Sequence, residues 1–373
     1  MSKKIFISQL ASPCAYGSSA TTQVFNFFKN NGYEICSKPK NADTLLLNIC
    51  GLLNENWLEQ LSAIKQYINL YEKKKIIIFG CLMKREKSIL DIAKNKENII
   101  FFDSTELTNF NKLFSHKIPI NKIQANIIKK EFLHKRDRSK KFFNIIISTG
   151  CTNFCSYCTY ALTRGIVKSK SINQIIKEIK SGLKQGFKNF YLYADEFGSY
   201  GRDINTNVIE LFEKISRIKT KTKFTISFEN FNPQKFVYFF KQLKPFLSLL
   251  QIKFIDIPIQ SGSKRILKLM NRKYSSKVVV KYIKELKEAS PDTTITTDII
   301  YCFPTETRED FNNSLKLIKY FDFATFHKYE KKYYAISSFI PERINSKEKK
   351  YRENLISELR NNFKDKKILR PYC

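Results

Sequence analysis

Short apolar runs alternate with amphipathic polar stretches along the first hundred residues. Nearly continuous apolar strands separated by helices of this length are typical of a parallel sheet that is covered on both faces. We therefore predict that residues 1–104 form a doubly wound α/β domain. Its strands are expected at residues 5–10, 44–50, 76–81 and 99–103, and its helices at residues 20–30, 56–71 and 84–95.

A second series of apolar runs begins at residue 142 and predicts a (β/α) barrel, complete or partial, over residues 142–330. The expected strands are 142–148, 187–194, 224–228, 254–260, 294–303 and 323–329, and the expected helices are 172–185, 208–218, 234–243, 277–288 and 308–320. Residues 105–141 are expected to form a basic linker and residues 331–373 a charged helical tail.

Three cysteines directly follow the first barrel strand with the spacing Cys151-x3-Cys155-x2-Cys158. A closed zinc site requires four ligands, and a [4Fe-4S] cluster is normally held by four thiolates. Three thiolates on a cluster therefore leave one iron open to a small molecule, which indicates chemistry. The alternatives are a zinc site and three unrelated buried thiols.

Three further cysteines lie at the ends of three strands of the N-terminal domain: Cys14, Cys50 and Cys81. Because the carboxyl ends of parallel strands meet at one edge of a sheet, where α/β folds bind ligands, we predict a second three-cysteine cluster there. The alternative is that these are structural thiols. Cys36, Cys302 and Cys373 are not expected to be ligands.

Polar residues at the ends of the barrel strands are expected at its mouth, where a cofactor would bind: Asp195, Glu196, Glu229, Gln260 and Asp298. Any one of them could equally be a rim residue without function. Tyr157, directly before the third cysteine of the loop, joins this set. No side chain is assigned an acid or base role, because cofactors of this kind carry the difficult steps.

Composition is ordinary for a soluble globular protein, with 43% hydrophobic and 27% charged residues in 373. No apolar run approaches the roughly 18 residues that span a bilayer, and the first residues lack a signal-peptide pattern, so we expect a cytoplasmic protein without a membrane contact. The net charge of +32 favours a polyanionic partner, or reflects solvated lysines in a biased composition. The basic run at residues 129–141 could likewise lie along a phosphate backbone or be only solvated.

The cluster loop, with Tyr157 before its third cysteine, resembles the radical S-adenosylmethionine (SAM) superfamily, in which the open iron binds the amino and carboxylate groups of SAM. The six cysteines together resemble the radical SAM methylthiotransferases. Further similarity lies in residues 163–165, 195–203, 258–263, 265–272 and 297–307, so the resemblance covers roughly residues 4–320.

This resemblance implies an N-terminal domain with an auxiliary [4Fe-4S] cluster, a radical SAM barrel with a second [4Fe-4S] cluster, and an RNA-binding TRAM domain, which this chain is expected to lack. It implies replacement of an inert C–H by C–SCH3, with SAM as source of the methyl group and of a 5'-deoxyadenosyl radical. An external electron donor of flavodoxin or ferredoxin type is implied as well. Phe-rich barrel strands are expected to supply dry apolar walls around the radical.

The substrate expected from charge and resemblance is a tRNA adenosine next to the anticodon. The alternative is methylthiolation of a protein or ribosomally made peptide side chain, for which an RNA-binding module is unnecessary. A reading of another class is a catalytically inactive iron-sulfur RNA-binding protein, because the residues around Cys14 depart from the family pattern.

Overall fold

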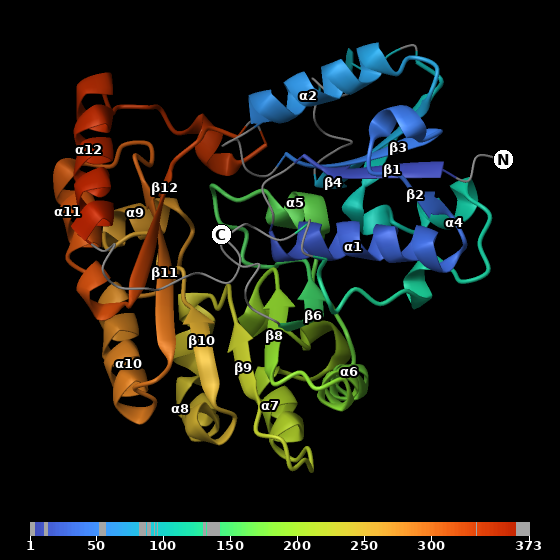
Figure 1. The fold of residues 1–373 in the computed structure, drawn as a ribbon. Helices are drawn as coiled ribbons and strands as arrows, with labels where there is room; N and C mark the ends of the chain where they lie inside the picture. Colours follow the sequence, from blue (N-terminus) through green and yellow to red (C-terminus); the bar gives the residue numbers. More distant parts are fainter. Residues whose placement is uncertain are drawn as a thin grey trace. The chain divides into compact units, whose positions relative to one another are not determined.

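The computed structural model describes residues 4–10, 14–51, 57–81, 87, 91–92, 94, 96–129, 132, 142–332 and 334–362. The chain divides into two compact units, one within residues 1–140 and one within residues 141–369 (Figure 1). Across these described ranges, no helix combines the length and the apolar character needed to cross a membrane.

The first unit contains a sheet of five described strands in which each neighbouring pair is parallel. Its strand order is β2-β1-β3-β4-β5, so the direction of winding reverses between β1 and β3. In open α/β sheets, ligands bind at the carboxyl edge beside such a switch point. The strands are β1 (Lys4–Gln9), β2 (Glu34–Ile35), β3 (Thr44–Cys50), β4 (Lys75–Cys81) and β5 (Ile99–Asp103).

Helices cover both faces of this sheet. Helix α1 (Ala15–Asn30) packs on the face that carries Leu46. Helix α2 (Trp57–Leu70) packs through Ile64 on the face that carries Leu45. Because neighbouring residues of β3 serve opposite cores, the doubly wound α/β prediction is confirmed.

The segment that follows β5 packs onto the α1 face of the sheet. Phe110 in helix α4 (Asn109–Leu113) and Ile120 at the start of a 3-10 helix (Ile120–Lys122) are fully buried in the core shared with α1. This part of residues 105–141 therefore belongs to the N-terminal unit. Most of the basic run that follows, residues 130–131 and 133–141, lies outside the described residues.

The second unit contains a seven-stranded sheet in the order β12-β11-β10-β9-β8-β6-β7. Among the described strands, β12 and β7 each pair with one neighbour, so the sheet is open and the barrel is partial. Six strands are parallel, and only the two-residue β7 runs antiparallel to β6. The strands are β6 (Phe143–Thr149), β7 (Lys168–Ser169), β8 (Asn189–Ala194), β9 (Thr225–Phe228), β10 (Ile252–Asp256), β11 (Thr294–Tyr301) and β12 (Phe323–Lys328).

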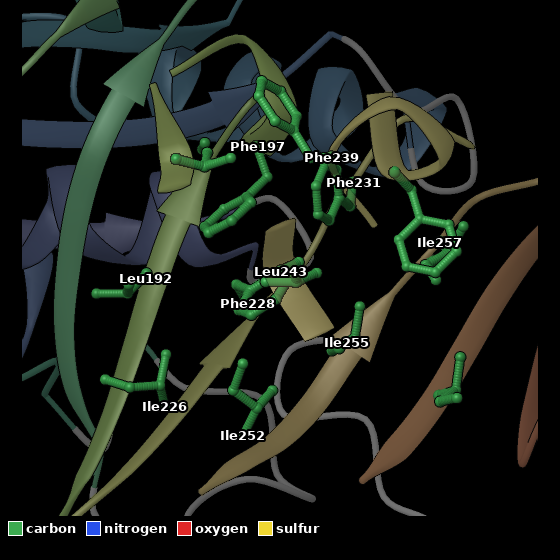
Figure 2. Close-up of a cluster of buried hydrophobic side chains, with 14 of the residues drawn as sticks. Leu192, Phe197, Ile226, Phe228, Phe231, Phe239, Leu243, Ile252, Ile255 and Ile257 are labelled. Carbon is green, nitrogen blue, oxygen red and sulfur yellow. The ribbon is translucent and has the colours of Figure 1, made fainter. Parts of the chain in front are cut away.

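A large apolar core lies between these strands and the helices that cover their outer side. Figure 2 shows Leu192, Phe228 and Ile255 of three successive strands beside Phe239 and Leu243 of α8. The covering helices are α6 (Ile172–Lys184), α7 (Val208–Ser216), α8 (Pro233–Leu249), α10 (Ser276–Ala289) and α11 (Arg308–Leu315) (Figure 1).

Several element boundaries differ from the sequence prediction by more than two residues. Helix α1 begins five residues early, because the Cys14 side chain caps it by accepting a hydrogen bond from the Gly17 N–H. Helix α8 continues past residue 243 and through Pro245, since burial of Leu247 holds its last turn. Strand β10 ends at Asp256 rather than at residue 260. The predicted helix at residues 84–95 lies largely outside the described residues.

The helix α12 (Ser346–Asn362) joins the second unit through a buried ion pair. The Arg352 guanidinium donates to the Glu306 carboxylate at 2.6 Å, and both side chains are almost completely excluded from solvent. Desolvation raises the pKa of Glu306 to about 7, although the positive charge of Arg352 acts in the opposite direction. This buried ion pair therefore holds the C-terminal helix against the second unit, although removing the two charges from water costs much free energy.

Replacing Arg352 with Met is expected to lower the free energy of unfolding of this unit by about 3–5 kcal/mol near neutral or higher pH, since a buried carboxylate loses its partner. The folded pKa of Glu306 exceeds its ordinary value of 4.5, so its contribution to stability is present below pH 4.5 and is lost as pH rises through 7. The loss in R352M should therefore be smaller at about pH 5. Urea unfolding of parent, R352M and E306Q tests this, and an R352M loss independent of pH contradicts it.

Candidate functional site

The three N-terminal cysteines line one hollow at the carboxyl edge of the first sheet, beside the β1/β3 switch point. Cys14 lies between β1 and α1, and Cys50 and Cys81 are register partners on β3 and β4. The sequence prediction that these cysteines share one edge is confirmed. The hollow is lined by Gln9, Cys14, Gly17, Asn48, Ile49, Cys50, Gly80, Cys81 and Ser104.

Two glycines keep the backbone close around these sulfurs. A Cβ on Gly17 would lie 3.2 Å from Cys14 Sγ, and a Cβ on Gly80 would lie 1.8 Å from the carbonyl oxygen of Ile49. Gly80 also has a φ of +154°, which a residue with a side chain rarely adopts. The buried Gln9 Oε1 has no hydrogen-bond partner among the residues that the structure describes. A thiol-lined hollow with an unpaired polar atom fits a metal cluster better than an apolar core does.

The second three-cysteine set occupies residues 151–158, here called the cluster loop, directly after β6. The loop begins at Gly150, whose φ is +84° and whose added Cβ would lie 2.2 Å from the Ile166 carbonyl oxygen. The Gly150 N–H donates to Asp195 Oδ2 at 2.8 Å, and the Cys151 N–H donates to the Gly165 carbonyl at 3.1 Å. Close backbone contacts on both sides thus fix the start of the loop.

The thiols of the cluster loop require a positive partner to become ligands. Burial, with the neighbouring thiols adding to it, raises the pKa of Cys151 to about 12 and that of Cys158 to about 11. Metal ligands must be thiolates, so a bound metal has to supply the stabilising charge. Without metal, these thiols would be inert at neutral pH.

In the described parts of the chain, no three His, Cys, Asp or Glu side chains converge closely enough to hold a single metal ion. This disfavours the zinc alternative for either cysteine set. It does not oppose an iron-sulfur cluster, because each thiolate of a cluster binds a different iron and the ligands stand farther apart.

Asp195, which the sequence places at the barrel mouth, makes contacts that hold the start of the cluster loop. Besides accepting from Gly150, its carboxylate accepts from the Tyr193 hydroxyl at 3.0 Å and lies 3.8 Å from Arg164 Nε, with both members of that ion pair buried. The neighbouring Glu196 uses its carboxylate to accept from the backbone N–H groups of Gly198 and Asn232, and burial raises its pKa.

The other residues predicted to bind a cofactor differ in their burial and in their partners. Gln260 is 8% exposed and adopts a left-handed φ of 61°. Within the described ranges its buried Oε1 has no hydrogen-bond partner, which leaves this oxygen available to a ligand. Asp298 Oδ1 lies 3.1 Å from Nε2 of His327, a residue that the sequence did not indicate. Glu229 follows β9, and Tyr157 packs against the buried Met270 cluster.

Phenylalanines of the barrel strands lie on both faces of the sheet. Phe143, Phe190 and Phe228 belong to the core between the strands and the covering helices. Because side chains alternate along a strand, the opposite face carries their neighbours. That face includes polar residues such as Asp256, which accepts a hydrogen bond from Thr296 at 2.7 Å. The face opposite the helix-side core is thus mixed, because it also carries the buried rings of Tyr191 and Phe254, and apolar walls around a radical stay a prediction.

Two family models match the chain. The Radical SAM superfamily model matches residues 145–318, and the model of Uncharacterized protein family UPF0004 matches residues 6–102. The first spans the cluster loop and the strands from within β6 to β11, and the second spans nearly all of the five-stranded sheet with its three cysteines.

Curated relatives match most of the chain. The ribosomal protein uS12 methylthiotransferase RimO of Carboxydothermus hydrogenoformans is 32% identical over 86% of this chain and 73% of the relative. The tRNA-2-methylthio-N(6)-dimethylallyladenosine synthase of Thermoanaerobacter sp. is 29% identical over 93% of this chain and 76% of the relative. A probable threonylcarbamoyladenosine tRNA methylthiotransferase of Pyrococcus horikoshii is 30% identical over 78% and 68%, respectively.

Solved structures with the same fold include two cobalamin-dependent or cobalamin-bound radical SAM enzymes. TsrM from Kitasatospora setae, with cobalamin and a [4Fe-4S] cluster bound, has a TM-score of 0.59 at 10% identity over 88% of this chain and 75% of that one. Apo OxsB has a TM-score of 0.57 at 12% identity, and this chain spans 54% of its length. At such low identity these likenesses concern the fold alone.

Proposed function

This chain belongs to the radical SAM methylthiotransferase family, and from that premise we propose that it inserts a methylthio group into an unactivated C–H bond of a tRNA adenosine next to the anticodon. The protein is a transferase. Its cofactors are SAM and two [4Fe-4S] clusters, which supply, when bound, the methyl group, the sulfur chemistry and the radical that removes the substrate hydrogen.

The observation that carries the proposal is the placement of three cysteines at the carboxyl edge of each sheet. Cys14, Cys50 and Cys81 would hold the auxiliary cluster in the hollow beside the switch point. The cluster loop would hold the second cluster and leave one iron open for SAM. Gln260 Oε1 is the side-chain atom best prepared to contact SAM, because it is buried and unpaired.

The choice of tRNA rests on charge and on relatives. A net charge of +32 favours a polyanionic substrate, since basic residues bind phosphate by displacing counterions. Relatives named for tRNA-2-methylthio-N(6)-dimethylallyladenosine and for threonylcarbamoyladenosine tRNA both match this chain over more than three quarters of its length. An external one-electron donor of the flavodoxin or ferredoxin type belongs to the same proposal.

The second candidate substrate is a protein side chain. It is favoured by the 32% identity to the RimO relative, which is named for ribosomal protein uS12. A protein substrate requires no extended phosphate-binding surface. The lysines and arginines of the chain would then be solvated surface residues without a polyanionic partner.

Nucleoside mass spectrometry of tRNA from a strain without the gene separates the two substrates. We expect a methylthiolated adenosine to disappear and to return with the parent gene, but not with a gene in which Cys151, Cys155 and Cys158 are alanine. Peptide mass spectrometry of ribosomal proteins from the same cultures is the matched measurement. Unchanged tRNA together with the loss of a methylthiolated peptide would transfer the assignment to the protein substrate.

A further inference from the structure

The cluster loop is clamped by a segment that lies far away in the sequence. The Ser156 N–H donates to the Met270 carbonyl at 3.1 Å, and Ser156 Oγ donates to the Leu269 carbonyl at 2.7 Å. Asn271 Nδ2 donates to the Phe154 carbonyl at 2.9 Å across 117 residues of sequence. These contacts come from the end of helix α9 (Lys264–Leu269) and the residues after it.

The same segment places a buried positive charge against one cluster cysteine. Arg272 is 8% exposed, and its Nη1 donates to Cys155 Sγ at 3.6 Å. Its Nη2 donates to the Pro258 carbonyl at 2.5 Å, two residues before Gln260, and its guanidinium lies 5.6 Å from the centre of the Tyr274 ring. Its Nε is buried and has no hydrogen-bond partner in the described part of the chain.

The other buried arginines show what is unusual about Arg272. Arg164 faces the Asp195 carboxylate at 3.8 Å, and Arg352 binds the Glu306 carboxylate at 2.6 Å. Among the described residues, Arg272 forms no ion pair with Asp or Glu, although a guanidinium cannot lose its charge. Buried charges are normally paired, so the Cys155 sulfur as thiolate is the anion that this arginine is placed to balance.

We infer that Arg272 is a positioning residue that holds the Cys155 thiolate and raises the reduction potential of the cluster bound by Cys151, Cys155 and Cys158. The inference rests on the proposed function, which places a [4Fe-4S] cluster on these cysteines. One-electron reduction adds one negative charge to the cluster, and the electron comes from an external one-electron donor. A fixed positive charge and a hydrogen bond at a ligand sulfur stabilise the reduced form more than the oxidised form.

Redox titration with dithionite, followed by electron paramagnetic resonance without SAM, tests this inference. The full-length C14A/C50A/C81A protein serves as background, so that only the barrel cluster titrates. R272M should lower the equilibrium constant for reduction about tenfold or more, equivalent to at least about 59 mV. R272K keeps the positive charge, so its reduction potential should fall clearly less than that of R272M. N271A removes a loop contact without removing a charge and should leave the potential unchanged.

Each possible result either supports the inference or contradicts a stated claim. An R272M potential lowered by less than about 59 mV, or a shift in R272K as large as in R272M, overturns the inference. If R272M binds no iron, R272Q compared with R272K carries the same test. Loss of iron in all three arginine variants, with iron retained in N271A, also overturns it, because Arg272 would then be needed for assembly. A background protein without any cluster contradicts the proposed function instead.

Discussion

Changing Cys151, Cys155 and Cys158 together to alanine is expected to halve the iron of anaerobically reconstituted protein and to abolish reductive cleavage of SAM. The parent should hold about eight irons per chain as two [4Fe-4S] clusters. Removing the cluster loop thiolates removes the iron that has an open position, and with it the electron path to SAM. Iron analysis and detection of 5'-deoxyadenosine measure the two effects.

The complementary variant separates the two sites. Replacing Cys14, Cys50 and Cys81 with alanine should also halve the iron but leave SAM cleavage, now without methylthio transfer. Cys36→Ser is the matched control, because Cys36 is buried in the core of the first unit away from the hollow. Full iron in the Cys14, Cys50 and Cys81 variant would show that the N-terminal cysteines are structural thiols.

The edge at which each cysteine set gathers was predictable, because it follows from strand direction. Cys50 and Cys81 end neighbouring parallel strands, so their register pairing brings them together whatever the packing of the helices. The succession of apolar runs and helical stretches likewise predicted both sheets. It did not reveal that Phe143, Phe190 and Phe228 face the helices, since each strand has two sides and the pattern alone does not say which is inner.

The contacts around the cluster loop were not predictable from local pattern. Arg272 and Cys155 are 117 residues apart, and their contact depends on where α9 packs after the whole barrel has formed. Asp195 and Glu196 are adjacent carboxylates at the same strand end. Only the structure shows that the Asp195 carboxylate accepts a hydrogen bond from the Gly150 N–H. It also shows that the Glu196 carboxylate accepts from the backbone N–H groups of Gly198 and Asn232.

Affinity for tRNA is expected to fall steeply with salt, which is the second large effect. A protein that neutralises 6–10 phosphates loses about 10³–10⁵ in affinity between roughly 50 and 200 mM salt, whereas binding of an apolar peptide barely changes. We expect residues of the basic run at 129–141 to make part of these contacts, which position the RNA without reading its sequence. Neutralising Lys129, Lys130, Lys135, Arg136 and Arg138 should therefore weaken binding and flatten the salt slope.

A matched control distinguishes specific contacts from net charge. Neutralising five exposed lysines on the outer helices α6 and α8 changes the charge of the chain by the same amount: Lys177, Lys180, Lys184, Lys241 and Lys244. Lys129 Nζ lies 3.9 Å from the centre of the Phe25 ring, so a second variant that retains Lys129 preserves this packing contact. Both basic-run variants should weaken tRNA binding more than the control while retaining full iron. Equal weakening by the control assigns the effect to overall charge, and a parent protein without salt-dependent binding favours the protein substrate.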